Sequence, residues 1–389
     1  MTPAARLSAA ITVLDRILAG AAVEPCLTSW GRANRFAGSG DRHAIRDLVF
    51  DALRKRRSYA ALGGGLTGRG LMLGALRAAG TDPATLFTGL GHAPLPVGPL
   101  DDGRAPLGAE AVDVPDWLEA PLRGALGVEY QPVMQAMRER APVFLRVNLA
   151  RISRDEAVRH LAADGIAVTP HTLAASAVQV TKGERRIAVS GAYLTGLVEL
   201  QDASSQAVVE VLDLRPGLRV LDYCAGGGGK TLAMAARGVA PFAYDISSAR
   251  MGDLSVRAKR AGARVTILKD PAMSAPYDLI LVDAPCSGSG SWRRDPQGKW
   301  ALTAARLAAL VQVQADILQR AVGLLAPDGV LAYVTCSLLS EENEAQVAGF
   351  VARHLGFPVT HQRRFSPLEG GDGFFVTLLT RKGGAPTQL

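Results

Sequence analysis

The stretch LRVLDYCAGGGGKT, residues 218–231, decides the fold class. Its first six residues are typical of a buried strand, its four glycines form a turn, and a helix is expected to begin near Lys230. A glycine-rich turn between a strand and a helix lets backbone amides approach a ligand at the helix N-terminus. The stretch therefore predicts an α/β sheet with a ligand at the carboxyl ends of its strands.

The same alternation continues towards the C-terminus. Further strands are expected at 241–245, 264–268, 277–283, 329–335 and 374–381. Helices are expected between them, over 247–262, 302–324 and 341–353. Strands that alternate with helices of this length predict a doubly wound, mostly parallel sheet, which we assign to residues 201–389.

Two further domains are expected before residue 201. Residues 1–80 carry apolar side chains at helical spacing, and residues 91–115 are rich in proline, glycine and acidic side chains, so residues 1–112 are predicted to be a helical domain with a linker. In residues 113–200, PVFLRVN (142–148) is a strand signal and Ser153 is expected to cap a helix. Short β-rich runs follow, which predicts a small α+β domain.

Charge and composition limit the class of protein. Residues 1–80 hold 12 Lys and Arg against 5 Asp and Glu, an excess that equals the net charge of +7 of the whole chain. The densest cluster is Arg54, Lys55, Arg56 and Arg57. A localised basic surface suits a polyanion such as RNA, although a solvated helix face explains the same charges equally well.

The cellular compartment and metal content follow from the same composition. No apolar run approaches the length of a membrane span, and Asp15 and Arg16 interrupt the apolar N-terminal stretch, so we expect a cytoplasmic protein with no membrane partner. The four cysteines are too scattered for a disulfide framework or a zinc site, and the six histidines form no ligand cluster. We therefore expect no metal.

Two interpretations of the glycine-rich turn remain open. A triphosphate-binding loop requires glycine at position 224, where this chain has cysteine. An adenosine-containing cofactor needs instead a carboxylate after the second strand for the ribose hydroxyls, and Asp245 stands there. Two further strand ends carry cysteines, Cys286 shortly after Asp283 and Cys336 after residue 335. If these strands are neighbours, both thiols point into the crevice of the cofactor.

Two thiols beside an adenosine cofactor suit methylation of cytosine. Carbon 5 of cytosine is a poor nucleophile, but addition of a thiolate to carbon 6 makes the ring an enamine that attacks the methyl group of S-adenosylmethionine. A base must then remove the proton from carbon 5 before the thiol leaves. Asp283 could stabilise the ring nitrogens, and the target base must leave its stack.

The motifs resemble those of the RsmB/Sun family of RNA cytosine-5 methyltransferases. The resemblance covers about residues 113–381, and the Pro-Cys and Thr-Cys-Ser motifs in this order are highly specific. Its other pieces are VPDWL (114–118), LRVN (145–148), QDASSQ (201–206), WRRDPQGKW (292–300), YVTCSLLSEENE (333–344) and GGDGFF (370–375). It implies a Rossmann-like class I methyltransferase domain, preceded by a small RNA-recognition-like α+β domain.

The resemblance also implies roles for individual residues. Cys336 is the covalent nucleophile and Cys286 assists release of the product, with Asp283 and Lys230 completing the catalytic group. The implied contacts to S-adenosylmethionine are Cys224, Ala225, Gly226, Gly227, Gly228, Gly229, Lys230, Asp245, Arg250, Asp270 and Asp283. The family loop reads CAAPGGK, so Gly226 and Gly227 replace an alanine and a proline here. We expect this loop to be more flexible when free, so that Gly227→Pro would strengthen cofactor binding.

The substrate is inferred from the N-terminal part. Residues 1–90 loosely resemble the all-helical NusB-like domain of the bacterial ribosomal members, best in GSGDRHAIRDLVFDALR (38–54). This favours ribosomal RNA (16S) over transfer RNA for a protein expected to be a monomer. The basic cluster and Trp292, Arg293 and Arg294 are the candidate RNA contacts.

Three alternatives stay open: a transfer RNA methyltransferase, a DNA-type methyltransferase with Cys286 as the nucleophile, and a non-catalytic RNA-binding relic.

Overall fold

The computed structural model describes residues 1–381 and contains two compact units. One is formed by residues 1–140 together with 292–301, the other by residues 141–291 together with the chain from 302 onwards. Each unit has a hydrophobic core of its own. Among the described residues, no helix has both the length and the apolar character that a membrane span requires.

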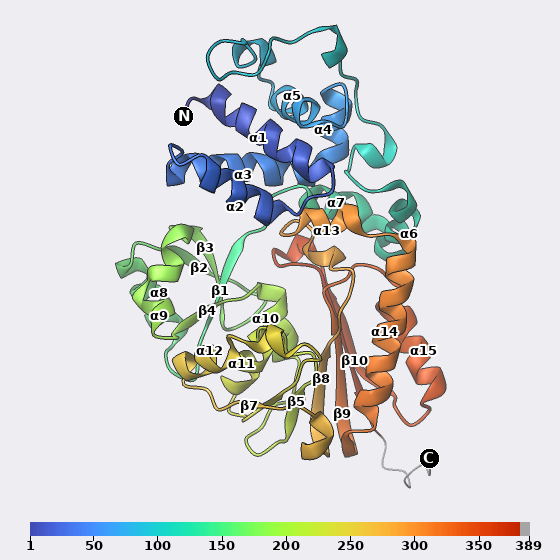
Figure 1. The fold of residues 1–389 in the computed structure, drawn as a ribbon. Coiled ribbons are helices and arrows are strands. Elements are labelled where there is room, and N and C mark those ends of the chain that lie inside the picture. The colour runs from blue at the N-terminus through green and yellow to red at the C-terminus, as the bar shows by residue number, and fades with distance from the viewer. Residues whose placement is uncertain (382–389) are drawn as a thin grey trace. The chain divides into compact units, whose positions relative to one another are not determined.

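The first unit is helical, as the sequence predicts (Figure 1). Its core is formed by apolar faces of α1, α2, α3 and α5, and Thr2 caps α1 through its side chain. A Cβ atom on Gly74 would lie 2.0 Å from the carbonyl oxygen of Tyr59, so only glycine allows this approach of α5 to α4. The helices are α1 (Pro3–Leu18), α2 (Val23–Ala33), α3 (Ser39–Arg54), α4 (Arg56–Leu62), α5 (Gly68–Ala78), α6 (Asp116–Leu126), α7 (Tyr130–Met137) and α13 (Pro296–Ala301).

The expected linker is an integral part of this unit. Asp101 forms an ion pair of 2.7 Å with Arg69 of α5. Asp113 is fully buried, accepts a hydrogen bond from the backbone amide of Ser58 at 2.8 Å and pairs with Arg138 at 2.8 Å. Through these contacts residues 91–140 pack with the helices, so the compact units divide near residue 140, whereas the sequence predicted a boundary near residue 112.

The second unit begins with a four-stranded antiparallel sheet in the strand order β2-β3-β1-β4. The predicted strand is β1, and Ser153 caps α8 in a capping box with Glu156 as expected. The elements are β1 (Val143–Val147), α8 (Arg154–Ala163), β2 (Ala167–Pro170), β3 (Ala177–Lys182), α9 (Gly191–Leu194) and β4 (Val198–Leu200).

The rest of this unit is a seven-stranded sheet in the order β10-β11-β9-β8-β5-β6-β7. β7, β6, β5, β8 and β9 are parallel, and β11 and β10 are antiparallel to their neighbours. The strands are β5 (Val220–Asp222), β6 (Phe242–Ala243), β7 (Thr266–Ile267), β8 (Tyr277–Asp283), β9 (Leu325–Thr335), β10 (Val359–Phe365) and β11 (Phe374–Thr380).

Helices cover both faces of this sheet (Figure 1). Leu279 and Leu281 of β8 pack with α10 and α11, while Ile280 and Val282 pack on the opposite face with α14 and α15. This alternation is that of a strand buried on both faces and confirms the doubly wound prediction. The helices are α10 (Ala203–Glu210), α11 (Gly229–Ala235), α12 (Leu254–Ala261), α14 (Ala304–Val322) and α15 (Glu344–Arg353).

One strand was missed. β10 lies at the edge of the sheet, pairs only with β11, and exposes its first five residues. Its sequence VTHQRRF therefore carries no apolar alternation, which was the signal used for the other strands.

Candidate active site

Two cysteines meet at the carboxyl ends of neighbouring strands. β8 and β9 are parallel and in register up to the pair Asp283 and Val334, so the residues that follow both strands lie at one edge of the sheet. The Sγ atoms of Cys286 and Cys336 are 3.4 Å apart there, within hydrogen-bonding distance for thiols. The prediction that both thiols lie in one crevice is confirmed.

The two thiols differ in electrostatic environment. The hydrogen bond with Cys336 and burial raise the pKa of the Cys286 thiol well above its ordinary value. The raised pKa means that the Cys286 thiol holds its proton, and either sulfur can be the donor in the hydrogen bond between the two cysteines.

A buried ion pair lies beside the thiols. Nζ of Lys230 donates to Oδ2 of Asp283 at 2.7 Å and lies 4.9 Å from the centre of the Phe374 ring. Burial alone would lower the pKa of Lys230, but the charge and hydrogen bond of Asp283, with a contribution from Cys336, raise it. Lys230 is therefore a fixed positive charge close to the Cys336 sulfur, and such a charge stabilises a thiolate.

The glycine-rich turn is held in shape by its neighbours. Gly226 and Gly228 have φ angles of +51° and +80°, which side chains other than glycine rarely adopt. The backbone amide of Gly226 donates to Oδ2 of Asp245 at 2.9 Å, and Arg250 pairs with the same oxygen at 3.1 Å. The carboxylate of Asp245, which was predicted to bind the cofactor, thus also holds the glycine-rich turn in place.

A second contact joins the turn to the small sheet. The Arg257 guanidinium donates to the carbonyl oxygen of Gly227 and also pairs with Glu199 of β4 at 3.0 Å. Arg260 pairs with the other oxygen of Glu199. The small sheet therefore supports the glycine-rich turn through Arg257 of α12.

A cavity of about 280 Å³ opens beside the turn. Its walls combine apolar side chains with the buried carboxylate of Asp245, a combination that fits an adenine ring and the hydroxyls of a ribose. Burial raises the pKa of Cys224, so its thiol is neutral and acts as a small apolar wall. The lining residues are Tyr223, Cys224, Tyr244, Asp245, Ile246, Arg250, Pro285, Val313, Asp316, Ile317 and Arg320.

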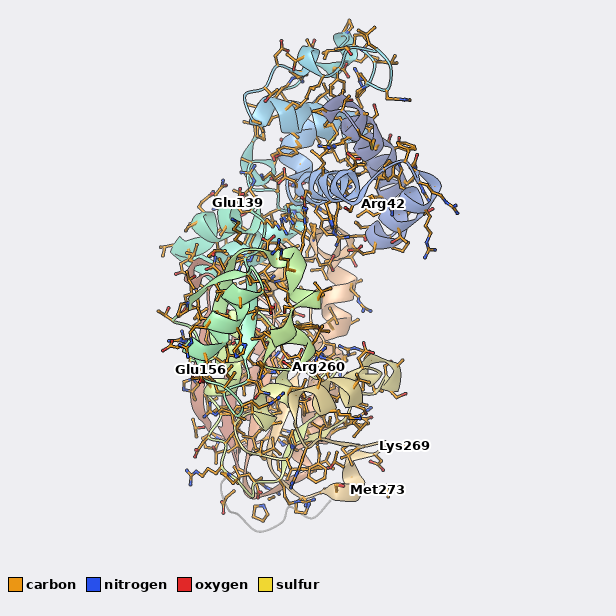
Figure 2. The ribbon with its side chains drawn as sticks, turned by 90° about the vertical axis from the view of Figure 1, so that its left-hand side faces the viewer. Arg42, Glu139, Glu156, Arg260, Lys269 and Met273 are labelled. Carbon is orange, nitrogen blue, oxygen red and sulfur yellow. The ribbon has the colours of Figure 1, made fainter. Side chains whose placement is uncertain are left out.

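Of the predicted cofactor residues, Cys224, Asp245 and Arg250 are among those that line this cavity. Residues 225–230 and Asp283 stand at the same strand ends but outside the lining, and Asp270 is outside it as well. Asp270 is exposed on the loop after β7, between Lys269 and Met273, whose side chains lie at the surface in Figure 2. Its Oδ1 accepts the backbone amide of Ala272 at 2.9 Å and so caps a short helical turn. The local structure explains this carboxylate without a ligand.

Asp222 is a residue of this site that the sequence analysis missed. It ends β5, is 1% exposed, and accepts a hydrogen bond from the hydroxyl of Thr231 at 2.6 Å, while its other oxygen has no partner among the described residues. Burial raises the pKa of Asp222 to about 7. Its position directly before Tyr223 and Cys224 was the available signal, since a carboxylate is unusual at the end of a buried strand.

Three of the candidate RNA contacts, Arg54, Trp292 and Arg293, are buried within the helical unit, whereas Arg294 is exposed. Arg54 is 8% exposed, and its Nε donates to the carbonyl oxygen of Arg293 at 2.7 Å. Trp292 and Arg293 are 2% and 5% exposed, so neither side chain is placed to stack on or pair with RNA. RNA contact by these residues stays a prediction that the structure does not favour, because their side chains are buried.

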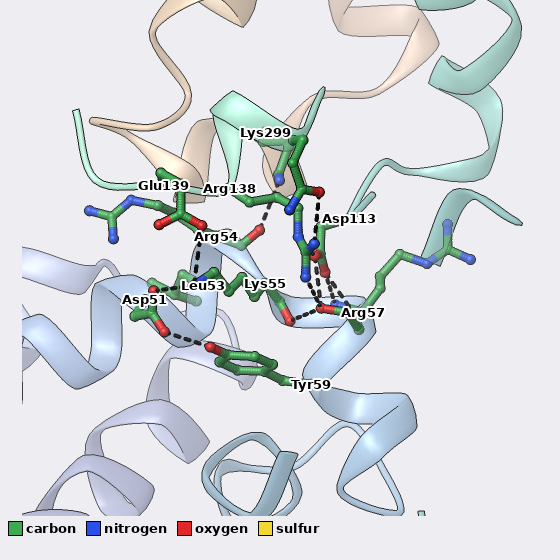
Figure 3. Close-up of polar contacts among 12 residues, drawn as sticks. Asp51, Leu53, Arg54, Lys55, Arg57, Tyr59, Asp113, Arg138, Glu139 and Lys299 are labelled. Carbon is green, nitrogen blue, oxygen red and sulfur yellow. Dashed lines mark hydrogen bonds and ion pairs between the residues drawn. The ribbon is translucent and has the colours of Figure 1, made fainter. Parts of the chain in front are cut away.

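The neighbouring side chains of the cluster are half-buried and also make contacts within the helical unit (Figure 3). Lys55 pairs with Asp51 at 3.1 Å, Arg56 lies 5.2 Å from the Trp300 ring, and Arg57 pairs with Asp116 at 2.6 Å. The contacts of α13 complete this region: Nζ of Lys299 donates to the carbonyl of Arg54 at 3.1 Å, and the Trp300 indole donates to that of Leu53 at 2.6 Å. Arg54 and Arg56 thus contact residues 292–301, whereas Lys55 and Arg57 pair with carboxylates elsewhere in the unit.

No group of three or more His, Cys, Asp or Glu residues among residues 1–381 is arranged to hold a metal ion. Asp283 is instead paired with Lys230, and the thiols of Cys286 and Cys336 lie within hydrogen-bonding distance of each other.

Comparison with known proteins gives the family. A family model described as "16S rRNA methyltransferase RsmB/F" matches residues 209–380, and one described as "Methyltr_RsmF/B-like, ferredoxin-like domain" matches residues 114–185. The chain belongs to the RsmB/F family. The predicted resemblance and the small α+β domain are thereby confirmed, while the likeness of residues 1–112 to NusB stays a prediction.

Two curated relatives illustrate how far the similarity of this RsmB/F family member extends. Ribosomal RNA small subunit methyltransferase B of Klebsiella pneumoniae is 35% identical over 287 residues, and that of Yersinia pestis is 33% identical over 285 residues. Both alignments cover 69% of this chain and 66% of the relative.

Two solved structures share the fold. PH0851 has a TM-score of 0.78 and 23% identity, and covers 97% of this chain and 99% of its own. A methyltransferase homologue from Pyrococcus horikoshii has a TM-score of 0.62 and 24% identity, over 70% of this chain and 97% of its own. At these identities the likeness concerns the fold alone.

Proposed function

We propose that this RsmB/F family member transfers the methyl group of S-adenosylmethionine to carbon 5 of a cytosine in RNA, through a covalent bond between Cys336 and the base. The observation that carries the proposal is the pair of sulfur atoms 3.4 Å apart beside the ion pair of Lys230 and Asp283. In the proposal one thiol adds to carbon 6 of the ring, and the other assists the later release of the methylated base.

Cys336 is the nucleophile in this proposal. It lies next to the positive charge of Lys230, which favours a thiolate, and within hydrogen-bonding distance of the Cys286 thiol. The thiolate adds to carbon 6 of the cytosine, and the electron pair of the 5,6 double bond makes carbon 5 nucleophilic. Asp283 is placed to accept a hydrogen bond from the exocyclic amine of the base, while Lys230 stabilises the charge that moves onto the ring.

Cys286 assists the second half of the reaction. After the methyl transfer, carbon 5 carries both a proton and the methyl group, and the proton must leave before the bond from carbon 6 to Cys336 can break. In this proposal a water molecule takes the carbon 5 proton, the electrons of that bond re-form the 5,6 double bond, and the Cys336 sulfur leaves with the electrons of its bond to carbon 6. Cys286 is within hydrogen-bonding distance of the leaving sulfur and donates its proton to it.

The cofactor contributes an electrophilic methyl group. Its adenosine fits the cavity of about 280 Å³, where Asp245 binds the ribose and Tyr223, Ile246 and Pro285 enclose the base. The glycine-rich turn brings backbone amides to the same edge of the sheet at the start of α11.

Small-subunit ribosomal RNA is the substrate we propose. Support comes from the relatives from Klebsiella pneumoniae and Yersinia pestis, both of which are named ribosomal RNA small subunit methyltransferase B. The aligned residues cover 66% of the length of each relative. We further propose that the protein acts as a cytoplasmic monomer.

The test uses the purified chain, labelled S-adenosylmethionine, and 16S ribosomal RNA or total transfer RNA as substrate. We expect label in 5-methylcytosine of ribosomal RNA and none with Cys336→Ala. Labelling of transfer RNA alone would replace the proposed substrate. No labelling of either RNA by a protein that binds the cofactor would favour the non-catalytic alternative.

A further inference from the structure

A buried carboxylate, which the proposed reaction does not use, lies behind the two thiols. Glu342 stands between β9 and α15 and is fully buried. Its oxygens accept the backbone amide of Ser287 at 2.8 Å, the side-chain amide of Gln314 at 3.0 Å, and the hydroxyls of Ser287 and Ser337. Two of these partners are amide N–H groups, which can only donate, and the two hydroxyls complete a shell of four hydrogen bonds that suits an ionised carboxylate.

The two serines are the sequence neighbours of the two cysteines. Ser287 follows Cys286 at the end of β8, and Ser337 follows Cys336 at the end of β9. One carboxylate therefore binds the residue next to each thiol. Without it, the side chains of these two residues are joined only through hydroxyl groups. Their own oxygens are 3.3 Å apart, and the Ser289 hydroxyl lies 3.1 Å from that of Ser287 and 3.0 Å from that of Ser337. Charge-assisted hydrogen bonds of this kind are about twice as strong as neutral ones.

No ion pair with a described residue offsets the free-energy cost of burying the Glu342 carboxylate. Among residues 1–381, Glu342 has no Lys, Arg or His within ion-pairing distance, and its hydrogen bonds all come from neutral groups. A buried charge without a counter-ion opposes folding unless hydrogen bonds satisfy it. A neutral residue would be the less costly choice for packing alone, so the charge itself indicates a role at the thiols.

We infer that Glu342 is a positioning residue: it holds Cys286 and Cys336 at hydrogen-bonding distance and thereby controls the proton exchange that releases the methylated base. The inference rests on the proposed function, since it assigns Cys286 to release. Glu342 forms no hydrogen bond with either sulfur in the described part of the chain and acts through Ser287 and Ser337.

The charge of Glu342 also acts on Cys286 directly. After the hydrogen bond with Cys336 and burial, the negative charges of Cys336 and Glu342 contribute to the raised pKa of Cys286. The groups that face Cys286 are Cys336 and the Tyr333 hydroxyl from β9 and Glu342 before α15, while Lys230 faces Cys336 from α11. Removal of the Glu342 charge is therefore expected to lower the pKa of Cys286.

The test is Glu342→Gln, which keeps the shape of the side chain but removes its charge and turns half of its acceptors into donors. We expect turnover on RNA to fall at least tenfold and the steady-state fraction of covalent protein–RNA adduct to rise at least threefold. The alkaline limb of the pH–rate profile should move to lower pH. A loss of packing alone would reduce turnover without enriching the adduct or moving that limb.

Glu344→Gln is the matched control, because Glu344 is two residues away and pairs with Arg364 instead of the serines. Its turnover, adduct fraction and pH profile should equal those of the wild type. A folded Glu342→Gln variant that equals the wild type in all three overturns the inference.

If Glu342→Gln does not fold, Ser337→Ala decides, since it removes one hydrogen bond to Glu342 and creates no unpaired charge. An adduct fraction raised at least twofold supports the inference, and an unchanged fraction overturns it. Formation of adduct by Cys336→Ala would instead overturn the proposed function itself.

Discussion

Nζ of Lys230 lies 2.7 Å from Oδ2 of Asp283, and both side chains stand at the edge of the sheet where Cys336 lies. Because this cation supports the thiolate and the charge on the cytosine ring, Lys230→Met is expected to lower turnover by about 10²–10³-fold at saturating substrate. Lys230→Arg should recover part of that loss. Single-turnover kinetics with ribosomal RNA measure it, and a loss of less than threefold in Lys230→Met would remove Lys230 from the catalytic group.

Asp222 predicts a pH dependence of folding. Its pKa of about 7 in the folded protein is above the ordinary value of 3.8 for an aspartate side chain, so between these two pH values the folded state holds a proton that the unfolded state has released. Stability from this group is therefore highest at low pH, falls as the pH rises to about 7, and is constant above. Relative to the wild type, Asp222→Asn should gain about 3 kcal/mol between pH 5 and pH 8.

Urea unfolding at these two pH values measures the gain. Thr231 can donate to the asparagine oxygen as it does to Asp222, so the variant keeps the local hydrogen bond. An equal difference from the wild type at both pH values would show that Asp222 ionises freely in the folded state.

The glycine-rich turn predicts opposite effects at adjacent positions. The amide of Gly227 has no hydrogen-bond acceptor among the described residues, so Gly227→Pro removes no bond and should tighten cofactor binding about two- to fivefold by restricting the free turn. Gly226 has a φ of +51°, and a Cβ there would lie 3.1 Å from Arg250, so Gly226→Ala should weaken binding. Calorimetry with S-adenosylmethionine measures both, and unchanged or weaker binding by Gly227→Pro contradicts the first expectation.

Replacement of Arg54 is expected to lower the stability of the protein and to leave RNA binding unchanged. Its buried guanidinium donates to the carbonyl of Arg293, so Arg54→Ala should destabilise the protein by about 1–3 kcal/mol through the unpaired carbonyl. The slope of log Kd for RNA against log salt should stay unchanged, because the side chain is 8% exposed. Arg35→Ala, at an exposed position after α2, is the control for charge. A shallower slope in Arg54→Ala alone would restore Arg54 as an RNA contact.

The sequence predicted the parts of the fold that depend on local pattern. The strands at 277–283 and 374–381 and the helix at 302–324 agree closely with β8, β11 and α14, because a buried strand and an amphipathic helix leave a periodic signal. β10 was missed because an edge strand is polar on both faces. The expected linker carried turn residues, but its contacts to Arg69 and Ser58 are distant in sequence and leave no local trace.

The part of the candidate site that lies at the ends of strands could be predicted from the sequence. Cys286, Cys336, Asp283 and Asp245 follow strands, and the order of the strands brings them together. The burial of Arg54 and Trp292 was not predictable, because a run of charges looks the same whether a partner or the protein itself neutralises it. Glu342 belongs to the motif YVTCSLLSEENE. Its contacts with Ser287, 55 residues earlier in the chain, and Ser337, five residues earlier, were visible only in the structure.

The most direct test of the account is a denaturing gel of 16S ribosomal RNA incubated with S-adenosylmethionine and wild-type, Cys286→Ala or Cys336→Ala protein. The sulfur geometry predicts a covalent protein–RNA band that accumulates in Cys286→Ala and is absent from Cys336→Ala. A band that accumulates in Cys336→Ala and is absent from Cys286→Ala would contradict the account and make Cys286 the nucleophile.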